Sequence, residues 1–226
     1  MESLESELAA ARDLDVADLA AAIETIGFEC TRCGACCKAE EGCDSGESDG
    51  TDQSDPHTAT VFPDEIRRLQ AAGDYDFRDV ARPMPYGIEE TPERPQGETF
   101  EWALQTDDCG DCTFYEESDG EGACTVHADR PLICRTYPFS VALGGTSQPM
   151  GEAVDADGMV RAHECEGLGR NISRADAEEL AAALKERAVR ELTEAIDVRE
   201  NYEATDADGV VVHDSEGQKR PDGTEL

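Results

Sequence analysis

Apolar residues near the N-terminus recur at helical spacing in two short stretches, separated by Asp15. They are Leu4, Leu8 and Ala11 in the first stretch and Val16, Leu19, Ile23 and Ile26 in the second. Residues three or four apart share one face of a helix, and an aspartate before such a run is a favoured N-cap. The pattern predicts helix over residues 3–27, in two pieces, ending at Gly27.

The longest periodic stretch lies toward the other end of the chain. Ser173 stands where an N-cap is expected, and a single apolar stripe follows it. The stripe contains Leu180, Ala181, Leu184, Ala188, Leu192, Ala195 and Ile196. It predicts a helix over residues 174–200. From residue 204 the sequence is polar, and we expect a frayed tail in which residues 210–212 could form a short edge strand.

Between these helices the pattern favours short elements. Pro63 stands near the first position of a short amphipathic helix that Gly73 should end, and the prolines of residues 81–97 exclude a long helix there. Alternation at Phe100, Trp102 and Leu104 predicts a strand, and residues 113–115 and 139–143 suggest two more. The fold class expected from this order is α+β, with short strands flanked by N-terminal helices and a long C-terminal helix.

Charge narrows the classes of protein that the chain can be. Its 226 residues include 53 Asp+Glu and 19 Lys+Arg, which gives a net charge of −34. A basic surface for nucleic acid is excluded, because phosphate binding needs clustered Lys and Arg. Only three of the basic residues are lysine, and the acid is spread along the whole chain. This composition is typical of salt-adapted proteins of halophiles, so we interpret the acid as a solvated surface rather than a docking site for a basic partner.

No apolar run reaches the roughly 18 residues that a membrane helix requires, so no membrane partner is expected. The first residues are acidic, whereas a signal peptide begins basic and then becomes apolar. These two observations predict a cytoplasmic protein.

Ten cysteines are the strongest chemical signal in the sequence. Cys30, Cys33, Cys36 and Cys37 fall within eight residues, and most of the others lie in the interior of the chain. A two-residue gap lets a turn aim two sulfurs at one ion about 2.3 Å away, as in zinc and iron–sulfur sites. Disulfides between such close neighbours would close very small loops and constrain the unfolded chain little. Metal ligation is therefore the favoured interpretation.

Four further motifs follow this cysteine cluster in a fixed order. They are Gly-Asp-Cys-Thr-Phe-Tyr at 110–115, Gly-Ala-Cys-Thr-Val-His at 122–127, Arg-Pro-Leu-Ile-Cys-Arg-Thr-Tyr-Pro-Phe at 130–139, and Cys-Glu-Gly at 165–167. Over residues 29–168 the chain resembles the CxxCxxCC, or YkgJ-type, cysteine-cluster family. Members of that family are described as zinc- or iron-chelating domains, and some as iron–sulfur proteins.

The resemblance implies eight metal ligands. They are Cys30, Cys33, Cys36, Cys37, Cys112, Cys124, Cys134 and Cys165. Eight thiolates divide into two sets of four, and each set is enough for one tetrahedral zinc or one cubane cluster. Cys43 and Cys109 are surplus, although Cys109 is also a candidate replacement for a family ligand.

Arg130 and Arg135 flank Cys134 and have two interpretations, which stay open here. Both could donate N–H bonds to a thiolate-ligated cofactor and offset its negative charge. Both could equally pair with the many surrounding carboxylates.

The metal and its role remain to be chosen among several hypotheses. The spacing CxxCxxC with a remote fourth cysteine favours an iron–sulfur cluster, [4Fe–4S] above all, while all-cysteine tetrahedra serve zinc equally well. A structural or electron-transfer centre is the first hypothesis. The alternatives are a zinc-binding protein or metal chaperone with an unknown protein partner, and a cluster-dependent group-transfer or redox enzyme, since flagellin lysine methylases have a similar cysteine cluster. The sequence carries no nucleotide loop or hydrolase motif that would decide for an enzyme.

These signals divide the chain into four segments. We predict an N-terminal helical segment (1–28), a metal-centred cysteine-cluster domain (29–168) with an acidic mobile loop at 38–60, a C-terminal helix (169–203) and an acidic tail (204–226).

Overall fold

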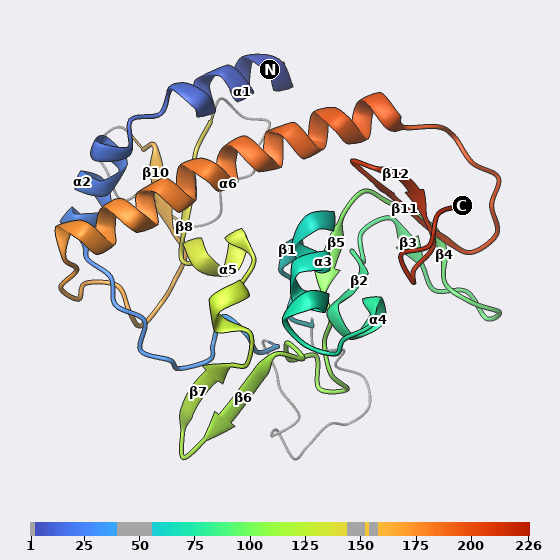
Figure 1. Ribbon diagram of the computed structural model, residues 1–226, viewed down its shortest axis with the longest axis horizontal. Helices are drawn as coiled ribbons and strands as arrows, with labels where there is room; N and C mark the ends of the chain where they lie inside the picture. Colours follow the sequence, from blue (N-terminus) through green and yellow to red (C-terminus); the bar gives the residue numbers. More distant parts are fainter. Residues whose placement is uncertain (1–2, 40–55, 144–151, 154–157) are drawn as a thin grey trace. The chain divides into compact units, whose positions relative to one another are not determined.

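A computed structural model describes residues 3–39, 56–143, 152–153 and 158–226 (Figure 1). The chain forms two compact units, and each takes residues from two separate stretches. Unit 1 is Met1–Thr31 with Leu132–Ile196, and unit 2 is Arg32–Pro131 with Asp197–Leu226. Most of the predicted acidic loop, residues 40–55, lies outside the described residues.

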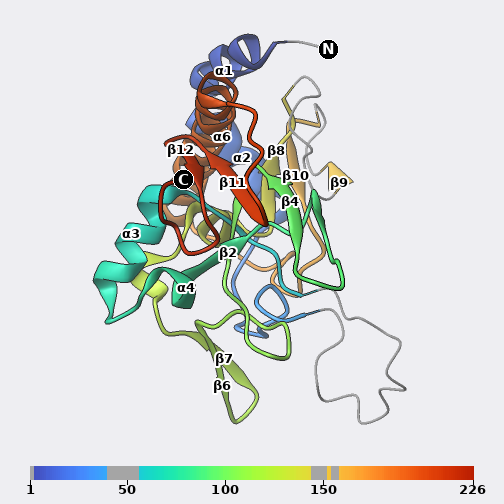
Figure 2. The same ribbon diagram turned by 90° about the vertical axis from the view of Figure 1, so that its right-hand side faces the viewer.

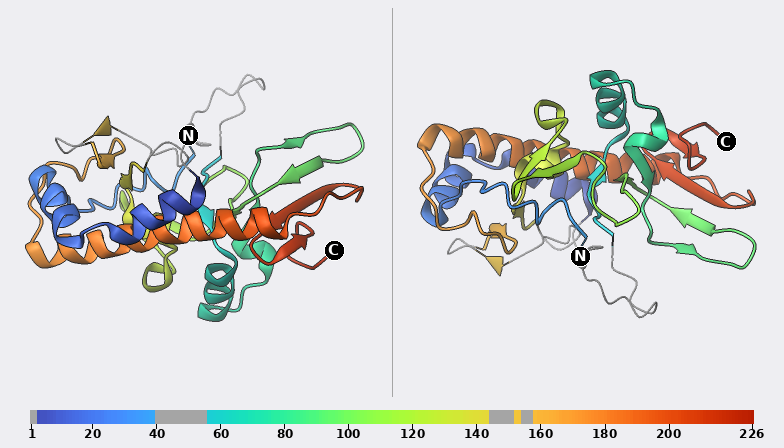
Figure 3. Two further views of the ribbon diagram at one scale, coloured as in Figure 1. Left: turned by 90° about the horizontal axis from the view of Figure 1, so that it is seen from above. Right: turned by 90° about the horizontal axis from the view of Figure 1, so that it is seen from below.

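Unit 1 combines helices with one small sheet. Helices α1 (Leu4–Asp13) and α2 (Val16–Ile26) lie beside the long helix α6 (Arg174–Asn201) (Figure 3). The Asp15 carboxylate caps α2 by accepting the Ala17 N–H at 2.7 Å, and Gly27 ends α2 with a φ of 74°. The predicted division of residues 3–27 and the predicted span of the long helix are both confirmed.

The sheet of unit 1 has the strand order β8-β10-β9, all antiparallel. Its strands are β8 (Phe139–Val141), β9 (Glu152–Ala153) and β10 (Val160–Ala162), and the short helix α5 (Leu132–Thr136) precedes them. One apolar core joins this sheet to the helices. Its most buried large side chains are Leu19, Ile23, Phe139, Val160 and Leu184. Alanines of α6, such as Ala177 and Ala181, let neighbouring elements approach closely.

Unit 2 contains a three-stranded antiparallel sheet in the order β1-β5-β2. The strands are β1 (Thr60–Val61), β2 (Ala81–Pro83) and β5 (Trp102–Leu104), accompanied by helices α3 (Pro63–Ala72) and α4 (Phe77–Val80). Pro63 occupies the first turn of α3 as predicted, and Gly73 follows its last residue. The predicted strand at Trp102 is confirmed, and all three residues of β5 are buried.

A second sheet of unit 2 has the order β12-β11-β4-β3. It consists of β3 (Ile88–Glu89), β4 (Gln96–Thr99), β11 (Val210–Asp214) and β12 (Gly217–Lys219), and β11 runs parallel to β4 (Figure 2). Val211 and Val212 are almost fully buried. The expectation of a frayed tail was therefore wrong. β11 is an inner strand, because β12 covers the edge that would otherwise be open.

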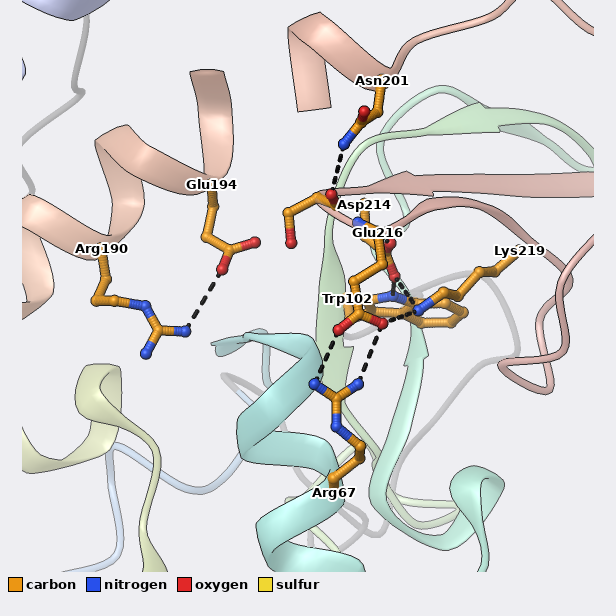
Figure 4. Close-up of polar contacts among 9 residues, drawn as sticks. Arg67, Trp102, Arg190, Glu194, Asn201, Asp214, Glu216 and Lys219 are labelled. Carbon is orange, nitrogen blue, oxygen red and sulfur yellow. Dashed lines mark hydrogen bonds and ion pairs between the residues drawn. The ribbon is translucent and has the colours of Figure 1, made fainter. Parts of the chain in front are cut away.

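Polar contacts, one group of them buried and one at the surface, attach these last strands to the rest of unit 2 (Figure 4). The Trp102 indole donates to Asp214 Oδ2 at 2.8 Å, and Lys219 Nζ lies 3.1 Å from the same carboxylate. Arg67 of α3 pairs with both carboxylate oxygens of Glu216, at 2.8 and 3.1 Å. Asp214 and Lys219 are almost fully buried. Their pairing satisfies charges that would otherwise be costly to desolvate.

Glu216 gives this network a pH dependence. Its hydrogen bonds from Arg67, together with Lys219, lower its pKa from 4.5 to about 2. A carboxyl group with a lowered folded-state pKa stabilises the fold above pH 4.5, and that contribution disappears as the pH falls toward 2. We expect Glu216→Gln to cost at most about 1 kcal/mol at pH 7, because the side chain is partly exposed and solvent screens the pair. Thermal melts of both proteins should converge near pH 2.

The control for this substitution is Glu93→Gln, which makes the same change at an exposed carboxylate. Its melting temperature should follow the wild type at every pH. A Glu216→Gln deficit of equal size at pH 7 and near pH 2 would contradict the prediction.

The remaining strands of unit 2 form a two-stranded hairpin, β6 (Tyr115–Ser118) and β7 (Glu121–Cys124). Asp119 and Gly120 connect them with φ values of 54° and 79°. Two positive φ angles define the tight turn that suits the twist of a hairpin, and Asp-Gly is a favoured sequence for it. The expected strand at residues 113–115 is thus displaced, because it begins at Tyr115 and continues into this turn.

The architecture as a whole confirms the α+β class, with helices at the N-terminal side and a long C-terminal helix. Within the described ranges, every helix is too short or too polar to cross a lipid bilayer.

Candidate metal centre

Two adjacent cysteines of unit 2 are brought together by a tight turn. Gly34 has a φ of 78°, and the Cys37 N–H donates to the Gly34 carbonyl oxygen at 2.7 Å. A positive φ is readily adopted only by glycine, so Gly34 allows the chain to reverse here. In the turn, the Sγ atoms of Cys36 and Cys37 lie 3.8 Å apart.

Two further predicted ligands lie in the same unit. The Cys112 N–H donates to the Cys37 carbonyl oxygen at 2.8 Å, which ties the two cysteine segments together. Cys124, the last residue of β7, is paired with Tyr115, the first residue of β6. The Tyr115 N–H in turn donates to the Cys112 carbonyl oxygen at 2.9 Å. The hairpin therefore holds Cys112 and Cys124 on neighbouring segments. Cys33 is half-buried and belongs to the same unit.

The thiols of this group influence one another electrostatically. The hydrogen bond from Cys37 and, to a smaller extent, the charge of Arg130 outweigh the effect of burial and lower the pKa of Cys36 to about 7. Burial raises the pKa of Cys112 to about 11, and charges on Cys124 and Cys36 act in the same direction. Burial also raises the pKa of Cys124. The pKa values of these thiols respond to each other, which places them in one electrostatic environment.

Arg130 and Arg135 fall in different surroundings. Arg130 follows the short 3-10 helix η1 (His127–Asp129), and its Nε donates to the His127 carbonyl oxygen at 3.1 Å. Its positive charge contributes to the lowered pKa of Cys36 and offsets part of the rise that burial causes in the pKa of Cys124. That Arg130 contacts a cofactor stays a prediction. Arg135 is an exposed residue of α5 in unit 1, and its role stays a prediction.

The other predicted ligands belong to unit 1. Cys30 is exposed and follows a short bridge between Phe28 and Leu168, where the Glu29 N–H donates to the Gly167 carbonyl oxygen at 3.0 Å. The Cys165 Sγ accepts the Gly167 N–H at 3.4 Å. Cys134 lies in α5 and is half-buried. Backbone pairing thus joins the segments of Cys30 and Cys165, which are far apart in sequence.

Cys109 and Cys43 are the two cysteines outside the predicted ligand set. Cys109 is disulfide-bonded, and in this state its sulfur offers no thiolate to a metal ion. Cys43 lies outside the described residues. The other eight cysteines are the predicted ligands, and none of them forms a disulfide bond.

The Cys36 and Cys37 sulfurs have a spacing that suits a single ion. Two thiolates bound tetrahedrally at about 2.3 Å from zinc lie about 3.8 Å from each other, which equals the observed separation. Among the residues that the structure describes, no three Cys, His, Asp or Glu side chains are grouped closely enough to hold a metal ion. Because of their separation, the Cys36 and Cys37 sulfurs fit two of the four positions of a tetrahedral site. Sulfur donors suit zinc and iron rather than magnesium or calcium.

A small α+β fold in which a cysteine-bearing turn meets a cysteine-bearing hairpin is typical of cysteine-rich metal-binding proteins. Comparison with protein families matches residues 29–166 to the CxxCxxCC family, described as "Putative zinc- or iron-chelating domain". That range spans more than half of the chain, so the protein belongs to this family and binds metal. No curated protein and no solved structure matches the chain.

Proposed function

We propose that unit 2 holds one metal ion on Cys36, Cys37, Cys112 and Cys124, in a structural role. The observation that carries this proposal is the 3.8 Å separation of the Cys36 and Cys37 sulfurs, the edge length of a zinc–thiolate tetrahedron. Adjacent cysteines so close together suit a single shared ion. A [4Fe–4S] cluster instead spreads its four thiolates over four irons.

Ligation in this centre requires the sulfurs of Cys112 and Cys124 to come closer to the Cys36–Cys37 pair, because in the described residues no three potential ligands are grouped closely enough to hold an ion. Cys112 and Cys124 have raised pKa values, so their thiols must lose protons when they bind a metal. Arg130 offsets part of the resulting negative charge, since it already stabilises the thiolate of Cys36. Such a site couples metal binding to folding, and it would tie the cysteine turn to the β6–β7 hairpin.

An iron–sulfur protein is the second candidate function. The spacing of Cys30, Cys33 and Cys36 favours it, because three cysteines two residues apart with a remote fourth are typical of ferredoxin-like clusters. It would imply electron transfer rather than a purely structural role.

Metal analysis of protein purified anaerobically is the test. We expect one zinc or iron ion per chain and no acid-labile sulfide. The ion should be lost in both Cys36→Ser and Cys37→Ser, because both sulfurs bind it. The protein should lack the broad absorbance that iron–sulfur clusters give near about 400 nm. Stable retention of the ion on dialysis would favour the structural role over a metal chaperone.

Two results would contradict the proposal. Acid-labile sulfide with the visible absorbance of a cluster would establish the iron–sulfur alternative. An ion retained in Cys36→Ser but lost in Cys37→Ser would show that the two sulfurs do not bind the same ion.

A further inference from the structure

A lysine, a tyrosine and a glutamate form a closed group beside the cysteine turn. Lys38 directly follows Cys37, and its ammonium group pairs with the Glu117 carboxylate on β6. Tyr115 donates its hydroxyl hydrogen to the same carboxylate at 2.6 Å. Lys38 Nζ also lies over the Tyr115 ring, 5.2 Å from its centroid. Each of the three side chains thus contacts the other two, and we call this group the Lys38 clamp.

Glycines on both sides leave room for the tyrosine ring. A Cβ atom at Gly34 would collide with the Tyr115 hydroxyl, and one at Gly122 would lie 2.7 Å from a carbon of the same ring. The ring of Tyr115 therefore fits against two backbone segments that carry no side chain. One of them is the turn that brings Cys36 and Cys37 together. The other belongs to β7, which ends at Cys124.

A second set of contacts fixes the other end of the cysteine turn. The Gly122 N–H donates to the Arg32 carbonyl oxygen at 2.8 Å, and Arg32 Nη1 lies 3.0 Å from Glu121. Both side chains of this ion pair are about two-thirds exposed, so the pair itself contributes little. The Lys38 clamp is less exposed and combines an ion pair, a hydrogen bond and a ring contact. Its side chains make more contacts with one another than the Arg32–Glu121 pair does.

We propose that the Lys38 clamp positions the cysteine turn on the β6–β7 hairpin and thereby sets how fast the bound metal ion leaves. This inference rests on the proposed function, because it takes Cys36, Cys37 and Cys124 as ligands of one ion. The three clamp residues bind no metal themselves. They hold the segment of Cys36 and Cys37 against the strand that delivers Cys124, so the ion cannot leave by opening of the turn unless the clamp breaks.

The experiment measures zinc release from the full chain. Zinc-loaded protein is mixed with an excess of a colorimetric chelator, and the release rate is recorded. We expect Glu117→Gln and Tyr115→Phe each to release zinc about 10-fold faster, at the low end of the effect usual for residues that orient metal ligands. Zinc per chain before mixing should stay at the wild-type value, since no ligand is removed.

Matched controls are available on the same strand and at the surface. Glu116→Gln changes the neighbouring glutamate of β6, whose side chain lies outside the clamp, and Tyr86→Phe changes a tyrosine that is 72% exposed. Both should release zinc at the wild-type rate. Exchange of the charges in Lys38→Glu/Glu117→Lys should restore slow release relative to Glu117→Lys alone. Melting of the metal-free variants separates a positioning effect from general destabilisation.

The outcomes distinguish the two proposals. Wild-type protein that binds no zinc would overturn the proposed function and the clamp with it. Full zinc content in all proteins, with Glu117→Gln and Tyr115→Phe releasing zinc at the wild-type rate, would overturn the clamp alone. The clamp would also fail if faster release only followed a lower melting temperature of the metal-free protein.

Discussion

Cys112→Ser should remove the metal ion of unit 2 and most of the stability of that unit. Cys112 is the most buried cysteine of the group, and its backbone is bonded to Cys37 and Tyr115. For structural zinc peptides, metal binding contributes roughly 10–16 kcal/mol that is coupled to folding. This range reaches or exceeds the whole stability of a typical domain, about 5–15 kcal/mol. Metal content by mass spectrometry and a chemical denaturation curve would measure the two losses.

The control for the metal content is Cys109→Ser, the same substitution three residues away at a cysteine outside the proposed ligand set. Cys109 is disulfide-bonded, so its substitution should leave the metal content unchanged. Equal metal loss in both variants, or full metal content in Cys112→Ser, would show that Cys112 is not a ligand.

Phe139→Ala should destabilise unit 1 by about 3–5 kcal/mol. The ring of Phe139 is 1% exposed and meets the Phe28 ring edge-on at 5.7 Å. Its removal leaves a cavity at the base of the sheet and loses the aromatic contact as well. Because Phe28 precedes Cys30 by two residues, the same change should loosen the segment that carries Cys30. Denaturation followed by the helical circular dichroism signal would report the loss, since α1, α2 and most of α6 lie in unit 1.

The matched change at a half-exposed position is Phe100→Ala. Its ring is 49% exposed, so we expect a cost of only about 1 kcal/mol. Similar losses for both phenylalanines would mean that the core of unit 1 is not packed around Phe139.

Local sequence signals predicted the helices well. Asp15, Gly27, Pro63 and Gly73 act through contacts within one or two turns, so their effect can be read from neighbouring residues. The pairing of the strands at residues 81–99 and 210–219 was harder to predict from the sequence. β4 and β11 pair in parallel although more than a hundred residues separate them, and the sequence holds no local trace of that partnership. The Asp119-Gly120 turn differs from these strands, because its hairpin signal is strictly local. It was nevertheless absent from the elements predicted from the sequence.

For the site, the spacing of cysteines predicted the chemistry but not the grouping. The family resemblance selected eight ligands, and the structure places Cys36, Cys37, Cys112 and Cys124 in one unit. This grouping depends on backbone hydrogen bonds between distant segments, such as that from Cys112 to Cys37. The Lys38 clamp was missed for the same reason, because Lys38 and Glu117 are 79 positions apart. Whether all eight cysteines bind metal stays a prediction.

The pairing of β4 with β11 bears on the order in which the protein is made. β11 is an inner strand of unit 2, yet it leaves the ribosome after every cysteine of the chain has been translated. Until then β4 lacks the partner that covers one of its edges, and Trp102 lacks Asp214, the acceptor of its indole N–H. The cysteines of unit 2 are therefore synthesised before the strand pairing of that unit can be completed.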